Sequence, residues 1–225
     1  MSIWIIFIAL TIFSVVISKN VERKFNKYSK IPTTGNLTGR QVAEKMLYDN
    51  DIHSVTIREV NGTLTDHYNP IDRTLNLSHD VYHGTSVAAA AVAAHECGHA
   101  VQHATAYTWL SLRSTLVPMV NFSNKFVSWI LLAGILLVQR FPQLLLVGIA
   151  LFAITTLFSI VTLPVEINAS HRALVWLNNH SITSSETHPY AESALRSAAY
   201  TYIIAALTSL ATLLYYVSIY MDSRR

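Results

Sequence analysis

One short segment of the chain, His95-Glu96-Cys97-Gly98-His99, has the residue types and spacing to bind and use a metal ion. On a helix, residues four apart are separated by about 6 Å along the axis and lie on nearly the same face, so His95 and His99 could ligate one tetrahedral zinc ion. Glu96 lies beside the first histidine, where it could take a proton from water acidified by the metal. The segment predicts hydrolysis with zinc as cofactor and Glu96 as general base.

The residues around this motif favour a helix. Gly84-Thr85-Ser86 offers a helix start, and an alanine-rich stretch follows, so we expect a metal helix over residues 85–104. Gly98 would let another backbone pack closely beside that helix. Cys97 is expected to face away from the histidines as a packed thiol and not a ligand. The alternative is a helix with ordinary polar histidines near a membrane surface.

A catalytic zinc ion needs a third protein ligand and an open position. Glu166 is the stronger candidate, because a carboxylate at a membrane edge is costly unless it has a partner. Pro164 predicts the first turn of a new helix there, although a glutamate placed only to suit the helix dipole is the alternative. His103 is rotated by about 80° from His95 and lies about 12 Å further along, too far for the same ion. His171 could act as a transition-state donor only if it faced the metal.

The chain of 225 residues is 52% hydrophobic and 13% charged, which is too apolar for a wholly water-soluble protein. Runs free of Asp, Glu, Lys and Arg cover residues 3–17, 126–138, 144–163 and about 198–220. The last two reach the roughly 20 residues that cross a bilayer, and the first two can be extended, the shortest of them backward past Lys125. We therefore expect about four transmembrane helices in the cell membrane.

The first apolar run is followed by a basic cluster consisting of Lys19, Arg23, Lys24, Lys27 and Lys30. The run has neither a preceding basic segment nor a small-x-small cleavage site, so we interpret it as an anchor and not as a cleaved signal peptide. By the positive-inside tendency, residues 19–125 and the active site are cytoplasmic. The cluster explains the net charge of +3 by contact with the lipid bilayer, without a nucleic-acid partner. The single cysteine excludes an internal disulfide framework.

The expected fold class is a mainly α membrane protein with a small α+β zincin-like cytoplasmic domain that carries the His-Glu-x-x-His helix. The expected segments are an N-terminal anchor at 1–18, the cytoplasmic domain at 19–125, a transmembrane hairpin at 126–163, a cytoplasmic helical segment with the third ligand at 164–197, and a C-terminal transmembrane helix at 198–225. Within the polar domain we expect a helix from Thr38, a strand over 54–60 and a pair of strands near 66–68 and 75–77.

Five sequence blocks occur in order across most of the chain. They are Asp66-His67-Tyr68-x-Pro70, Leu75-x-Leu77-Ser78-x-x-Val81-Tyr82-His83-Gly84, Ala93-Ala94-His95-Glu96-x-Gly98-His99-Ala100-x-Gln102-His103, Leu112-Arg113-Ser114-x-Leu116-Val117-Pro118 and Leu163-Pro164-Val165-Glu166-x-x-Ala169-Ser170. Together they resemble the YugP-like neutral zinc metallopeptidases of bacterial membranes. The resemblance implies that His95 and His99 are zinc ligands, Glu96 is the catalytic residue and Glu166 is the third ligand.

A more distant likeness is to membrane gluzincins such as HtpX and the CAAX prenyl proteases. In these proteins an acidic residue usually lies four positions after the ligand glutamate, and that position is Ser170 here. Zincin-type peptidases also hold an extended substrate against a sheet edge near the metal helix. Residues 75–77 could supply that edge, with an ordinary hairpin packed on the helix as the equal alternative.

We therefore expect a membrane-embedded zinc metallopeptidase, specifically a metalloendopeptidase, that acts on a peptide or membrane-protein substrate. The sequence favours no particular oligomeric state. A zinc amidohydrolase with a non-protein substrate is the alternative enzyme. A non-catalytic zinc-binding scaffold or chaperone is disfavoured by Glu96, because a structural site needs no general base and closes its fourth position with protein. A transporter is disfavoured because the apolar runs contain no charged residue to form an ion path.

Overall fold

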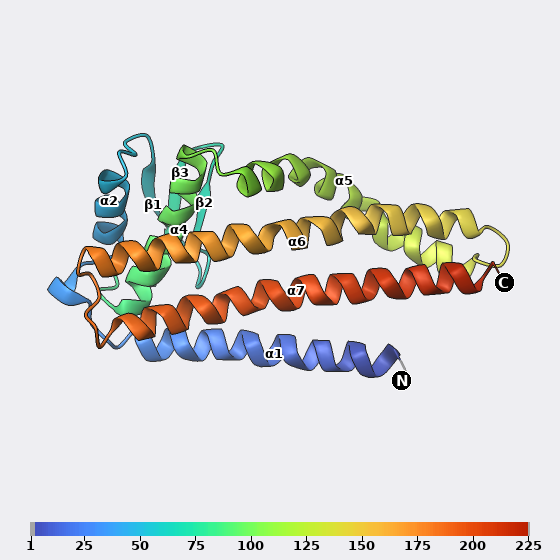
Figure 1. The fold of residues 1–225 in the computed structure, drawn as a ribbon, viewed down its shortest axis with the longest axis horizontal. Helices are drawn as coiled ribbons and strands as arrows, with labels where there is room; N and C mark the ends of the chain where they lie inside the picture. The colour runs from blue at the N-terminus through green and yellow to red at the C-terminus, as the bar shows by residue number, and fades with distance from the viewer. Residues whose placement is uncertain (1–2, 225) are drawn as a thin grey trace. The chain divides into compact units, whose positions relative to one another are not determined.

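In a computed structural model, which describes residues 3–224, the chain is mainly α-helical with a small mixed sheet (Figure 1). The long helices of this part of the chain are α1 (Ile3–Tyr28), α5 (Thr108–Leu136), α6 (Pro142–Asn179) and α7 (His188–Asp222). All four are long and apolar enough to cross a membrane, by length and composition. The expected fold class, mainly α with a small α+β part, is confirmed.

Shorter elements lie between α1 and α5. They are η1 (Thr34–Asn36), α2 (Gly39–Asp49), β1 (Thr56–Val60), β2 (His67–Asn69), β3 (Thr74–Ser78), α3 (His79–Tyr82) and α4 (Val87–Ala104). α2 starts at a capping box, in which Thr38 and Gln41 each accept a hydrogen bond from the other's backbone N–H. The helix and the strands expected in this region are confirmed.

The sheet has the strand order β1-β3-β2. β3 runs parallel to β1, with Thr56 opposite Thr74, and antiparallel to β2, with Tyr68 opposite Leu75. Every residue of β3 is buried. Of the two alternatives for residues 75–77, the free substrate edge is therefore wrong, because β3 is the central strand and its apolar side chains belong to the core. The edge strand that contacts α4 is β2.

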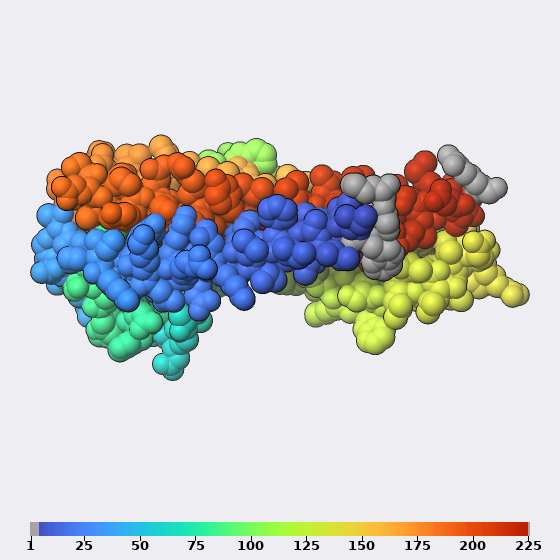
Figure 2. Space-filling model, turned by 90° about the horizontal axis from the view of Figure 1, so that it is seen from below, coloured from blue at the N-terminus to red at the C-terminus, as the bar shows by residue number. Residues whose placement is uncertain are grey.

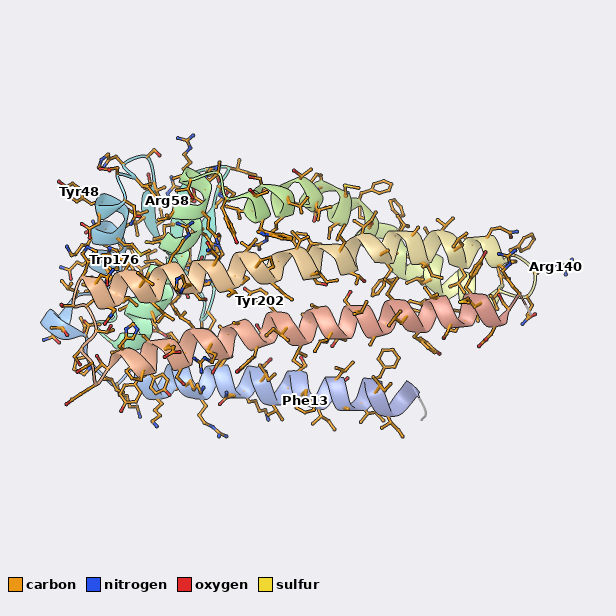
Figure 3. All side chains as sticks on the ribbon, in the orientation of Figure 1. Phe13, Tyr48, Arg58, Arg140, Trp176 and Tyr202 are labelled. Carbon is orange, nitrogen blue, oxygen red and sulfur yellow. The ribbon has the colours of Figure 1, made fainter. Side chains whose placement is uncertain are left out.

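Residues Val16–Tyr107 and Val165–Tyr200 form one compact unit, called the polar unit below. It contains the sheet and helices α2, α3 and α4. Its fully buried side chains include Met46, Leu75, Leu77, Val87 and Leu177. The C-terminal part of α6 joins this core, where the indole N–H of Trp176 (Figure 3) donates to the carboxylate of Asp49 on α2.

Residues Met1–Val15, Thr108–Pro164 and Thr201–Arg225 form a second unit, called the apolar unit. Within it, α5 and the start of α6 form an antiparallel hairpin. A Cβ placed on Gly134 would lie 2.7 Å from Cα of Leu145, so the small residue lets the two helices approach closely. On α1, shown in blue in Figure 2, apolar side chains such as Ile8 and Phe13 (Figure 3) are more than half exposed. Such a surface suits contact with lipid.

The expectation that Pro164 starts a new helix is wrong. α6 runs from Pro142 to Asn179, and Pro164 lies inside it. A proline removes one backbone hydrogen bond, but apolar helices tolerate it where neighbouring groups satisfy the freed carbonyl. One uninterrupted helix therefore carries both the apolar segment and Glu166.

Candidate metal centre

His95 and His99 of α4 meet Glu166 of α6 inside the polar unit. One ligand atom from each residue lies within 4.8 Å of the other two. Oε2 of Glu166 lies 3.3 Å from Nε2 of His95 and 3.6 Å from Nε2 of His99. Glu166 is buried, with 3% of its side chain exposed. The structure thus brings together the three residues that the sequence selected as candidate ligands.

The close approach of α4 to α6 depends on Gly98. A Cβ at this position would lie 2.6 Å from the carbonyl oxygen of Ala169, closer than atoms can pack. Gly98 adjoins His99 in α4, and Ala169 follows Glu166 by three residues in α6. The expectation that Gly98 lets another backbone pack closely is confirmed, and this contact sets the distance between the histidines and the glutamate.

Gln102 fixes the ring of His99. Its Nε2 donates to the carbonyl of Val165 at 2.8 Å and to Oδ1 of Asn168 at 3.0 Å. The amide oxygen of Gln102 is then the atom that faces Nδ1 of His99, at 3.0 Å. An amide oxygen can only accept, so a neutral His99 carries its proton on Nδ1. The lone pair on Nε2 is left facing Glu166, as a metal-binding histidine requires.

Ser170 makes the corresponding contact with the other ring. Its Oγ lies 3.1 Å from Nδ1 of His95. Membrane gluzincins usually have an acidic residue at the position of Ser170. The Ser170 hydroxyl still contacts the histidine. Two Nε2 nitrogens and one carboxylate oxygen are a donor set that catalytic zinc sites use. The residues present therefore fit a zinc ion.

Glu96 is buried beside this group, with 8% of its surface exposed. The backbone N–H of Tyr68 in β2 donates to its Oε2 at 3.0 Å. Burial lowers the pKa of His99, but hydrogen bonding to Glu166 and the negative charge of Glu96 outweigh burial and raise it overall. Glu96 is therefore within electrostatic reach of the candidate ligands, with one carboxylate oxygen fixed by the edge strand.

The other candidate side chains are engaged elsewhere. Nδ1 of His103 lies 2.8 Å from the hydroxyl oxygen of Tyr68. Cys97 is fully buried, and its Sγ lies 3.7 Å from a backbone carbonyl oxygen of α2. His171 is exposed and borders a separate hollow that is lined by residues of α2, α4 and α6.

Gln102, Tyr68 and Asp66 are structural partners that sequence reasoning missed. The Asp66 carboxylate accepts hydrogen bonds from the backbone N–H and the hydroxyl of Ser78, which ties the segment before β2 to the end of β3. Gln102 had a usable signal, since it lies three residues after His99 and such pairs share a helix face. Tyr68 contacts Glu96 through its backbone, which leaves no signal in residue type.

Comparison with known proteins gives matches over nearly the whole chain. Residues 3–221 match the family described as "Putative neutral zinc metallopeptidase". The chain is 39% identical over 223 residues to the "Putative membrane protease YugP" of Bacillus subtilis (strain 168), and the alignment covers 97% of this chain and 98% of that protein. No solved structure matches the chain. The similarity therefore spans both the polar and the apolar unit.

Proposed function

The chain belongs to the family of neutral zinc metallopeptidases, and we propose that it is a membrane-embedded peptidase whose zinc ligands are His95, His99 and Glu166. The observation that carries this proposal is the convergence of two Nε2 atoms on a buried carboxylate. The far side of each ring is already held, by Gln102 and by Ser170, so both Nε2 atoms are oriented for one ion.

Catalysis in this proposal depends on Glu96. A zinc ion held by the three ligands would supply Lewis acidity, polarising a carbonyl group and acidifying water. Glu96 takes the proton from the attacking water and gives it to the leaving amine. The Tyr68 N–H holds Oε2 of Glu96, so Oε1 remains for this proton transfer. Because Glu96 is buried, little bulk water competes for its proton.

The substrate we propose is a peptide or a membrane protein, bound in an extended form beside β2. Extended peptides add to exposed sheet edges through main-chain hydrogen bonds. β2 is the edge strand in contact with α4, and its Tyr68 also contacts the proposed base. A peptide on this edge would lie next to the metal centre.

We also propose that the polar unit faces the cytoplasm. The basic cluster that follows the apolar part of α1 supports this orientation. Lys30→Cys in a Cys97→Ala background is expected to resist membrane-impermeant maleimide in intact cells and to react after lysis. Labelling from outside would reverse the orientation.

The peptidase proposal is tested with protein purified in detergent and incubated with unstructured peptides. We expect cleavage by zinc-loaded protein, loss of cleavage after chelation, and recovery when zinc is restored. Cleavage that persists in metal-free protein would contradict the proposal. Hydrolysis of non-protein amides with peptides left intact would replace it with an amidohydrolase.

A further inference from the structure

Glu59, His79 and His83 form another group of possible metal ligands in the polar unit. One ligand atom from each lies within 4.8 Å of the other two. Nδ1 of His79 lies 2.7 Å from Oε1 of Glu59, and Nε2 of His83 lies 3.1 Å from Oε2. The two imidazole centroids are 4.9 Å apart. This group shares no residue with the centre formed by His95, His99 and Glu166.

The local fold explains why these side chains meet. β3 leads directly into α3, so His79 follows the last residue of the central strand. β1 is parallel to β3, with Val60 opposite Ser78, which brings Glu59 to the beginning of α3. His79 and His83 are four residues apart, one helical turn, and so lie on the same side of α3 and its C-cap.

The contacts within the group leave it exposed to solvent. Both oxygens of the Glu59 carboxylate are engaged, Oε1 by His79 and Oε2 by His83. The side chains are 41% to 72% exposed. An exposed ion pair of this kind contributes little to stability because solvent screens it. Stability alone therefore gives a weak reason for three such groups to converge.

A hollow of about 380 Å³ borders the two imidazoles. Its lining includes Phe25, Asn26 and Ser29 near the end of α1, together with His79, Asp80 and His83. A water molecule occupies about 30 Å³ in the liquid, so the hollow has room for the waters that complete a three-ligand coordination shell.

We propose that Glu59, His79 and His83 bind a divalent transition-metal ion at the surface of the polar unit. Imidazole suits zinc, copper and nickel, whereas calcium and magnesium prefer sites made of oxygen atoms. Because its three ligands are exposed, this site would bind the ion more weakly and exchange it more readily than the buried group. A bound ion would fasten the edge strand β1 to α3, which packs on the metal helix α4. The proposal does not depend on peptidase activity.

The test is a zinc titration of purified full-length protein in detergent, read with a chromogenic competing chelator. Wild-type protein is expected to bind one tight and one weaker equivalent. The double variant His79→Ala, His83→Ala keeps the tight equivalent and loses the weaker one, and Glu166→Ala does the reverse. Glu59→Gln retains a hydrogen-bond acceptor but loses the negative charge. Loss of a residue that merely hydrogen-bonds a metal ligand already lowers metal affinity by about tenfold or more. Loss of the Glu59 charge should therefore lower zinc affinity at the weaker site by at least about tenfold.

Two matched variants control for general surface effects. Arg58→Gln changes the neighbouring residue of β1 (Figure 3), whose side chain points to the opposite face of the strand. His53→Ala removes another exposed histidine, which packs beside Tyr48. Both are expected to keep two equivalents, with circular dichroism showing that every variant is folded. A single equivalent in wild-type protein, or a weaker equivalent unchanged by the double variant, would overturn the proposal.

Discussion

Within the part of the chain that the structure describes, the polar unit holds two groups of two histidines and one glutamate whose surroundings differ. In both, the histidines are four residues apart and the glutamate comes from another element. Glu166 is 3% exposed, and a polar side chain behind each ring turns Nε2 toward it. Glu59 is 41% exposed and itself bonds both imidazoles. Donor types alone therefore do not distinguish the two groups. Burial, fixed rings and the nearby Glu96 carboxylate are found only in the group that contains Glu166.

The largest expected effect comes from removing the glutamate of each group in turn. Glu166→Ala should weaken tight zinc binding by more than about 100-fold, because loss of a residue that merely hydrogen-bonds a ligand already costs about 10- to 100-fold. The same variant should abolish hydrolysis. Glu59→Ala should leave tight zinc binding and hydrolysis unchanged, because Glu59 is not a member of the buried group. Zinc content and peptide cleavage are measured in folded preparations.

His103→Ala is the control for the Glu166 variant, since its imidazole contacts Tyr68 and not the candidate ligands. It should retain tight zinc. Full zinc in Glu166→Ala together with loss in His103→Ala would reject the assignment in favour of a site built from one helix.

A smaller effect is expected from the residues behind the rings. Gln102→Met keeps the volume but removes the bonds to His99, Val165 and Asn168, so zinc affinity should fall by about 10- to 100-fold. Ser170→Ala removes a single contact, so zinc affinity should fall by about tenfold. Competition titration gives both values. Unchanged affinity in the two folded variants would mean that ring orientation does not separate the buried group from the exposed one.

Alkylation of Cys97, which requires no substitution, measures burial at α4 directly. Burial, and to a lesser extent the charge of Glu96, raises the pKa of the Cys97 thiol well above its ordinary value. Because Cys97 is the only cysteine in the chain, mass spectrometry can count its alkylation. Native protein should stay unmodified by maleimide at neutral pH, whereas denatured protein should react fully. Fast labelling of native protein would mean that Cys97 is accessible to solvent and that α4 is not buried.

Much of the centre could be predicted because its signals are local. The spacing of His95 and His99 is readable in any helix, and hydropathy finds the long helices. Glu166 could be chosen because a carboxylate at the edge of an apolar run is costly unless it has a partner. The meeting of Glu166 with both histidines agrees with that choice.

What could not be predicted depends on contacts between distant segments. The parallel pairing of β1 with β3 places residues 75–77 in the centre of the sheet and brings Glu59 to the histidines of α3. The contact of Gln102 with Val165 exists only because α4 and α6 pack closely at Gly98. A single sequence carries no signal for strand register or helix approach of this kind.

The most direct test of the proposed chemistry is to measure zinc content and peptide cleavage in one preparation of Glu96→Gln. Glutamine keeps an oxygen that can accept the Tyr68 N–H but cannot serve as the base. Glu96→Gln is expected to retain tight zinc while turnover falls by at least about 100-fold, because the general base is lost. Cleavage at the wild-type rate by the zinc-loaded variant would contradict the proposed chemistry.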